Sequence, residues 1–89
     1  MAKVTIKQLN DSEKKEKGIA SWPIWEKEIS RFEWYYDSKE FCQILEGEVT
    51  VHTDEGDYHF KAGDFVIFEK ELKCVWNVKK PVRKHYKFE

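Results

Sequence analysis

The sequence is poor in residues that cross-link or punctuate a chain. Its 89 residues include four glycines, two prolines and two cysteines. Two cysteines are too few for a multi-disulfide scaffold, and Cys42 and Cys74 are too far apart for a CxxC zinc or redox motif. We therefore expect both to be free thiols in a reducing compartment.

Targeting and membrane signals are also missing. The N-terminal stretch MAKVTIKQLNDSEKKEKGIA lacks the continuous apolar core of a signal peptide. No apolar run approaches the roughly 18 residues of a membrane span. The sequence predicts a cytoplasmic protein with no membrane partner.

Neither sign of charge dominates. The chain has 16 basic and 17 acidic residues, a net charge of −1. No segment concentrates the lysines into a basic stripe of the kind that binds phosphate backbones, so nucleic acid is not an expected partner. A chain this short supports one domain over residues 1–89 and leaves much of its surface exposed, which makes a homodimer a reasonable expectation.

Hydrophobic periodicity favours strands over most of the chain. Residues 11–18, DSEKKEKG, allow one short helix, with Asp11 or Ser12 as its cap and Gly18 as its end. From Ser21 onward the apolar residues alternate with period two, as in FEWYYD, EFCQILEG and LKCVWNV. Many short strands at turn spacings of about 8 to 12 residues predict a small all-β barrel or sandwich.

A hairpin is predicted where EVTVHT and DYHFKA flank Glu55-Gly56. This turn places His52 opposite His59 and Val51 opposite Phe60, so the apolar pairs share one face. The two histidines would be close enough to chelate an ion. Their face also carries Thr50, and we interpret them as a solvated pair.

The spacing of Glu40 and Gly47, followed by a strand, a hairpin and a turn at Gly63, resembles the cupin superfamily of jelly-roll barrels. On that pattern Glu40 and Gly47 match the glutamate and glycine of the first motif. The usual histidine places of this motif fall on Trp34 and Tyr36, or on Glu33 and Tyr35 if the gap is one residue longer. In the second motif Glu69 and Glu71 stand where proline and glycine are usual, and the third histidine place falls on Cys74.

A narrower resemblance spans residues 22–86, through WPIWEKE, FEWYYD, EFCQILEGEV, AGDFVIF, CVW and PVRKHY. These segments look like small single-domain cupins related to the cupin domains of (S)-ureidoglycine aminohydrolase. That enzyme uses a cupin-bound manganese ion to release ammonia from an ureido compound. Its metal ligands do not map onto this chain.

A cupin barrel would point Glu40 inward, and alternation would send neighbouring positions the same way. The hypothesis is an aromatic-walled pocket for a small polar metabolite. Its candidate ligand-binding residues are Trp34, Tyr36, Glu40, Cys42, Cys74, Trp76, Lys84 and Tyr86. The alternative is a barrel filled by its own side chains, with Glu40 bonded to Tyr36 or paired with Lys84.

The sequence is compatible with three classes of function. We expect a metabolite-binding protein without a cofactor, and the alternative of one divalent metal would use Glu40 and Cys74. The second class is a hydrolase or aminohydrolase-like enzyme on an ureido or amide nitrogen compound, with Cys74 as nucleophile and Glu40 either as base or as the group that orients a substrate amine. The third is a structural dimer in which Trp22 and Trp25 form an edge or dimer contact.

Overall fold

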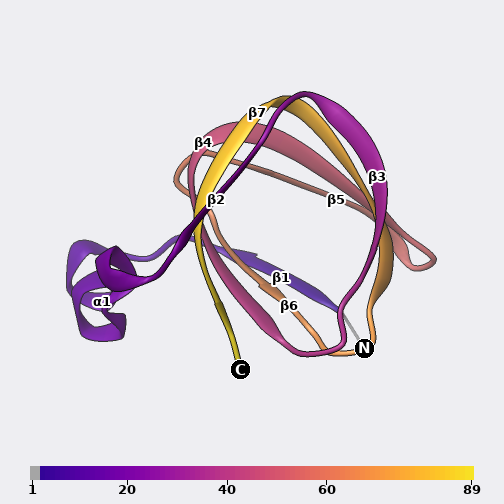
Figure 1. The fold of residues 1–89 in the computed structure, drawn as a ribbon. Coiled ribbons are helices and arrows are strands. Elements are labelled where there is room, and N and C mark those ends of the chain that lie inside the picture. Colours follow the sequence, from indigo (N-terminus) through magenta and orange to yellow (C-terminus); the bar gives the residue numbers. More distant parts are fainter. Residues whose placement is uncertain (1–2) are drawn as a thin grey trace.

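The computed structural model describes residues 3–89, which fold into a barrel of antiparallel strands with one helix beside it (Figure 1). This confirms the all-β prediction and the short helix near the N-terminus. A single turn of 3₁₀ helix follows that helix. In chain order the elements are β1 (Val4–Lys7), α1 (Asp11–Lys17), η1 (Ile19–Ser21), β2 (Ile24–Lys27), β3 (Ser30–Tyr35), β4 (Glu40–Thr53), β5 (Gly56–Lys61), β6 (Phe65–Phe68) and β7 (Lys73–Phe88).

Two long strands, β4 and β7, organise the barrel. They pair with each other along most of their lengths, and each takes part in both walls. The first half of β4 pairs with β6 and its second half with β5, while β7 pairs first with β3 and then with β2. The walls are therefore β5-β4-β7-β3 and β1-β6-β4-β7-β2, and their inner faces enclose the core. The sequence pattern predicts separate strands on either side of Gly47, whereas the structure joins them into one bent strand.

The bend in β4 depends on Gly47. Register shifts in the β4–β7 pairing lie between Ile44 and Val49, and Gly47 has a φ of +101°. A Cβ at this position would lie 2.7 Å from the Cα of Val82 and closer still to the carbonyl oxygen of Pro81. Only a residue without a side chain lets β7 cross β4 at this point. This close approach explains why the position of the first motif is a glycine.

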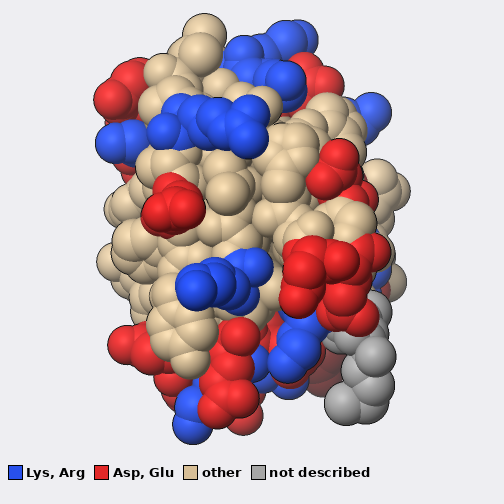
Figure 2. Space-filling model, turned by 90° about the vertical axis from the view of Figure 1, so that its right-hand side faces the viewer, with Lys and Arg blue, Asp and Glu red and all other residues tan. Residues whose placement is uncertain are grey.

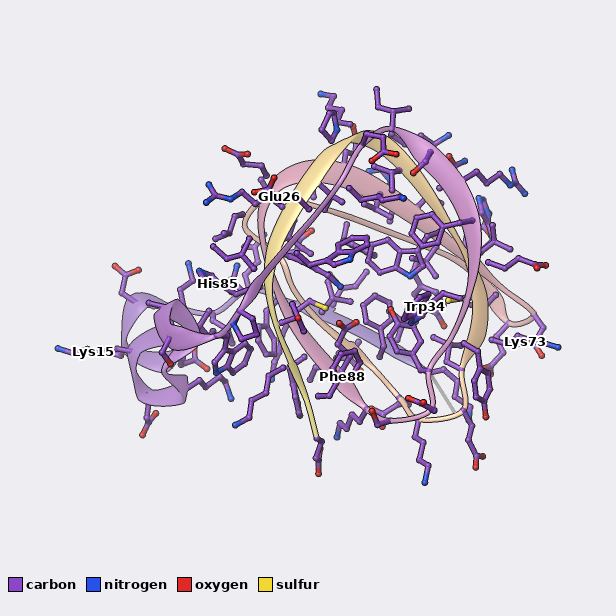
Figure 3. The ribbon with its side chains drawn as sticks, in the orientation of Figure 1. Lys15, Glu26, Trp34, Lys73, His85 and Phe88 are labelled. Atoms are coloured by element: carbon purple, nitrogen blue, oxygen red, sulfur yellow. The ribbon has the colours of Figure 1, made fainter. Side chains whose placement is uncertain are left out.

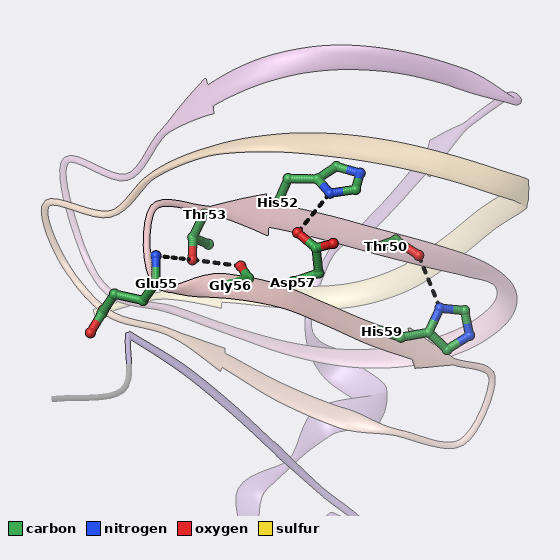
Figure 4. Close-up of polar contacts among 7 residues, drawn as sticks. All are labelled: Thr50, His52, Thr53, Glu55, Gly56, Asp57 and His59. Atoms are coloured by element: carbon green, nitrogen blue, oxygen red, sulfur yellow. Dashed lines mark hydrogen bonds and ion pairs between the residues drawn. The ribbon is translucent and has the colours of Figure 1, made fainter.

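The β4–β5 hairpin differs in register from the prediction (Figure 4). Thr53 pairs with Gly56, so Asp54-Glu55 forms the turn and Gly56 begins β5. Phe60 consequently lies opposite Val49. A shift of two residues keeps each side chain on its face, so the predicted inward residues of both strands are still buried.

The predicted cross-strand pairing of His52 with His59 is wrong. His52 lies opposite Asp57, with its Nδ1 2.8 Å from Asp57 Oδ1 (Figure 4). His59 lies opposite Thr50, and its Nδ1 is 3.0 Å from Thr50 Oγ1. Each imidazole therefore has its own partner on the facing strand.

Helix α1 begins one residue earlier than a cap at Asp11 predicts and two residues earlier than a cap at Ser12 predicts. Its N-cap is Asn10, whose side chain accepts from the backbone N–H of Glu13 while the Glu13 carboxylate accepts from the Asn10 N–H. Gly18 ends the helix in the left-handed conformation, as predicted. Ile19 of η1 packs with Leu9 and Phe65 in a small outer cluster.

The surface carries charges of both signs. On the face shown in Figure 2, Lys and Arg side chains are interspersed with Asp and Glu. Within residues 3–89, no helix has both the length and the apolar character needed to cross a membrane.

Candidate ligand-binding site

The space between the two walls holds a cavity of about 140 Å³. Trp34 and Phe88 lie inside the ring of strands, and Lys73 lies at its outer edge (Figure 3). Most of the lining is aromatic. The lining residues are Trp25, Phe32, Trp34, Tyr36, Glu40, Trp76, Lys84, Tyr86 and Phe88.

Strand pairing brings the two charged lining residues together. Glu40 opens β4, and Lys84 lies on the adjacent β7 opposite Ile44. Because Glu40 and Ile44 share a face of β4, the lysine stem runs back along that face toward the carboxylate. Lys84 Nζ lies 3.3 Å from Glu40 Oε1 and 3.2 Å from Oε2, so the ammonium donates to both oxygens.

The Lys84 ammonium is enclosed by further favourable contacts. It lies 3.3 Å from Cys42 Sγ, and it stands 4.9 Å and 4.8 Å from the ring centres of Trp25 and Trp76. Burial alone would lower the pKa of Lys84, but Cys42 and Glu40 outweigh it and raise the pKa above its ordinary value. Lys84 is therefore a fixed cation between two indoles.

Tyr36 supplies a buried hydroxyl next to this pair. Its backbone N–H donates to Leu72 O, which fixes the residue just after β3. Trp76 Nε1 donates to Tyr36 Oη at 3.2 Å, so the hydroxyl keeps its own proton for another acceptor. Burial is the larger cause and the Glu40 charge the next, and together they raise the pKa of Tyr36 well above 10. The phenol therefore stays protonated.

The two cysteines do not line the cavity. Cys42 is fully buried behind Lys84, and Cys74 Sγ points to the carbonyl oxygen of Trp34 at 3.6 Å. Both are free thiols, as expected. Burial raises the pKa of Cys74 to about 11 and raises that of Cys42 further, so both thiols are protonated at neutral pH.

Six of the eight predicted ligand-binding residues line the cavity, and Cys42 and Cys74 do not. Sequence reasoning missed Trp25, Phe32 and Phe88 as lining residues. Phe32 shares a face of its strand with Trp34, and Phe88 shares one with Lys84 and Tyr86, so alternation is the signal that identifies both. Trp25 lies on β2 at the edge of a sheet, and its indole also lines the cavity. The dimer contact expected of Trp22 and Trp25 stays a prediction.

The cupin resemblance implies a metal ion, and the residues present do not fit one. The Glu40 carboxylate already has Lys84 as its cation. In the part of the chain that the structure describes, no three His, Cys, Asp or Glu side chains converge on a common point. Lys84 stands where a metal bound to Glu40 would have to compete with it.

Residues 14–86 match the model of the EutQ-like cupin domain family. The chain belongs to this family. It is 49% identical to a DUF861 family protein from Thermotoga maritima, whose crystal structure superimposes with a TM-score of 0.94 over 97% of this chain and 99% of that chain. No match is found among the curated proteins.

More distant relatives of known structure share the fold. A putative ethanolamine utilization protein Q from Salmonella typhimurium is 22% identical, with a TM-score of 0.68 over 96% of this chain and 68% of that one. The EutQ protein of Clostridium difficile is 20% identical, with a TM-score of 0.67 over 93% of this chain and 64% of that one. These similarities establish the cupin fold and no specific activity.

Proposed function

We propose that this cupin binds a small polar metabolite inside the barrel. The observation that supports this most directly is the cavity itself, in which the polar groups of Glu40, Lys84 and Tyr36 face aromatic walls. A predominantly apolar pocket with a few placed polar groups is typical of small-molecule sites. Its volume of about 140 Å³ is close to that of the roughly 150 Å³ engineered cavity that holds benzene, so the ligand is of that size.

The polar lining favours a binding site over a core filled only for stability. A buried ion pair is often no more stabilising than apolar residues of the same volume. Glu40 and Lys84 therefore contribute little that well-packed apolar side chains would not. Trp34 and Phe88 line the same cavity and remain 47% and 44% exposed, which gives a ligand an apolar entrance.

The enzyme alternative, a hydrolase or aminohydrolase acting on an ureido or amide compound, has weaker support. It requires a thiolate at Cys74 or a metal at Glu40. The thiol of Cys74 has a pKa of about 11 and does not line the cavity, and Glu40 is paired with Lys84. This alternative rests on the narrower sequence resemblance alone.

The test is a screen of compounds about the size of benzene by NMR on isotope-labelled protein, followed by titration of the hits. We expect hits to shift the indole N–H signals of Trp25, Trp34 and Trp76 in a saturable way. Trp34→Ala should weaken binding. Tyr35→Ala is the matched control, because Tyr35 is the next residue of β3, is also half exposed and does not line the cavity.

Equal binding to both variants would place the ligand outside the barrel and contradict the proposal. So would a screen in which no compound gives saturable shifts in the wild type. Retained binding in Tyr35→Ala with loss in Trp34→Ala would support it.

A further inference from the structure

We infer that the ligand of this cavity is uncharged and carries both a hydrogen-bond donor and a hydrogen-bond acceptor, as a small carboxamide does. This inference rests on the proposed function and adds the chemical class of the ligand. It follows from the charge balance and the free hydrogen-bonding positions of the lining.

The charge of the lining is already balanced. Among the described residues that line the cavity, Glu40 and Lys84 are the charged ones, and each is 4% exposed. Their charges cancel at a separation of 3.2 Å. A charged ligand would lose its hydration on entering the cavity and would find no free countercharge there. This desolvation is costly in a site surrounded by indole and phenyl rings.

The donors of Lys84 are already used. Its ammonium donates to both Glu40 oxygens and to Cys42 Sγ, and two indole faces cover it. An anionic ligand would have to displace Glu40 to reach it. The raised pKa of Lys84 supports its treatment as a permanent cation.

The lining keeps both acceptors and donors for a ligand, and those nearest the ion pair are the Glu40 carboxylate and the Tyr36 hydroxyl. Each carboxylate oxygen of Glu40 accepts a hydrogen bond from Lys84 and has further lone pairs. The Tyr36 hydroxyl accepts from Trp76 and still has its own proton. A carboxamide N–H and carbonyl match this pair, whereas a carboxylate lacks the donor and an ammonium lacks the acceptor.

The experiment compares three small probes that share an isopropyl group on the wild-type protein: isobutyramide, isobutyrate and isobutylammonium. Dissociation constants come from the indole N–H shifts at neutral pH. We expect the amide to bind at least roughly tenfold more tightly than either ion, a difference of about 1.4 kcal/mol. A charged probe that binds as tightly as the amide would overturn the inference.

Two charge-removing variants sharpen the test. Glu40→Gln leaves the Lys84 cation unbalanced and should move the preference to isobutyrate. Lys84→Met leaves the Glu40 anion unbalanced and should move it to isobutylammonium. The double variant Glu40→Gln/Lys84→Met restores neutrality and should prefer the amide again. If a single variant does not fold, the comparison of the double variant with the wild type still tests whether a neutral lining selects a neutral ligand.

Failure of the inference differs from failure of the proposed function. Saturable binding of a charged probe in preference to the amide, weakened by Trp34→Ala, would overturn the neutral class and leave a ligand-binding cavity. Absence of saturable binding for all three probes on the wild type, together with a screen that yields no hit, would overturn both.

Discussion

Lys84 Nζ lies 3.2 Å from Glu40 Oε2 in the barrel interior, although the two residues are 44 positions apart in the chain. About 5% of each side chain is exposed. The pair joins β4 to β7 and sets the charge of the cavity. Its energetics can be separated from its role in binding.

Removal of one partner should cost far more stability than removal of both. Glu40→Gln leaves the ammonium of Lys84 buried without its countercharge, and we expect the free energy of unfolding to fall by about 3 kcal/mol. The double variant Glu40→Gln/Lys84→Met should regain most of that loss. Urea unfolding of the wild type, both single variants and the double variant gives the coupling energy. Additive losses in the four-protein comparison would show that the pair is not coupled.

Stability should decrease as the pH rises above about 9. The pKa of Cys74 rises from 9.0 to about 11 on folding, and burial also raises the pKa of Cys42 and Tyr36. Lys84 has a raised pKa as well. Above pH 9 the unfolded chain therefore binds fewer protons than the native protein, and the free energy of unfolding falls with pH.

Urea unfolding between pH 7 and 10.5 measures this decrease. The variant Cys42→Ala/Cys74→Ala should show a shallower decrease, because the two thiols no longer ionise in the unfolded chain. A free energy of unfolding that stays constant from pH 9 to 10.5 in the wild type would contradict the raised pKa values.

Gly47→Ala should destabilise the protein more than the same change at Gly63. Both glycines have positive φ, +101° and +98°. A Cβ at Gly47 would collide with the backbone at Pro81, whereas nothing lies within 4 Å of a Cβ at Gly63. We expect roughly 1 kcal/mol for Gly63→Ala from backbone conformation alone and at least about 2 kcal/mol more at Gly47. Equal losses in thermal or urea unfolding would mean that the strand crossing adjusts freely.

Glu71→Gly should stabilise the protein. Glu71 has a φ of +71°, and it is exposed, so little packing is lost with its side chain. The left-handed conformation costs a non-glycine residue about 1–2 kcal/mol, and the greater freedom of glycine in the unfolded chain returns part of this. We expect a net gain of about 0.5–1 kcal/mol in urea unfolding, and no gain for Glu71→Ala. A loss of stability in Glu71→Gly would show that the carboxylate has a structural role.

The alternation of side chains along the strands predicts which residues of the site point into the barrel. In the β7 segment Cys74, Trp76 and Val78 are buried as predicted, and the same rule places Lys84 inside. Period two assigns a face to each residue and does not depend on which strand lies beside it. For this reason the cavity lining was largely predictable once strands were assigned.

The register of the strands and the pairing of side chains between them were harder to predict from the sequence. Glu55-Gly56 has the composition of a two-residue hairpin turn, yet the strands pair two positions away from that prediction, and the hydrophobic pattern is the same in both registers. The Glu40–Lys84 pair was one alternative among several, because it depends on the β4–β7 register across 44 positions. Trp25 was missed because β2 has only four residues, too few for alternation to assign its inner face.

The sharing of β4 and β7 between both walls also bears on the order of folding. β4 leaves the ribosome well before β7, and neither wall is complete until β7 pairs with it. Glu40 can thus stay hydrated through the early steps, and its transfer out of water coincides with the arrival of Lys84. Contacts this distant in sequence form slowly, so the desolvation of the ion pair belongs to a late step, and variants at Glu40 should change the rate of unfolding more than the rate of folding.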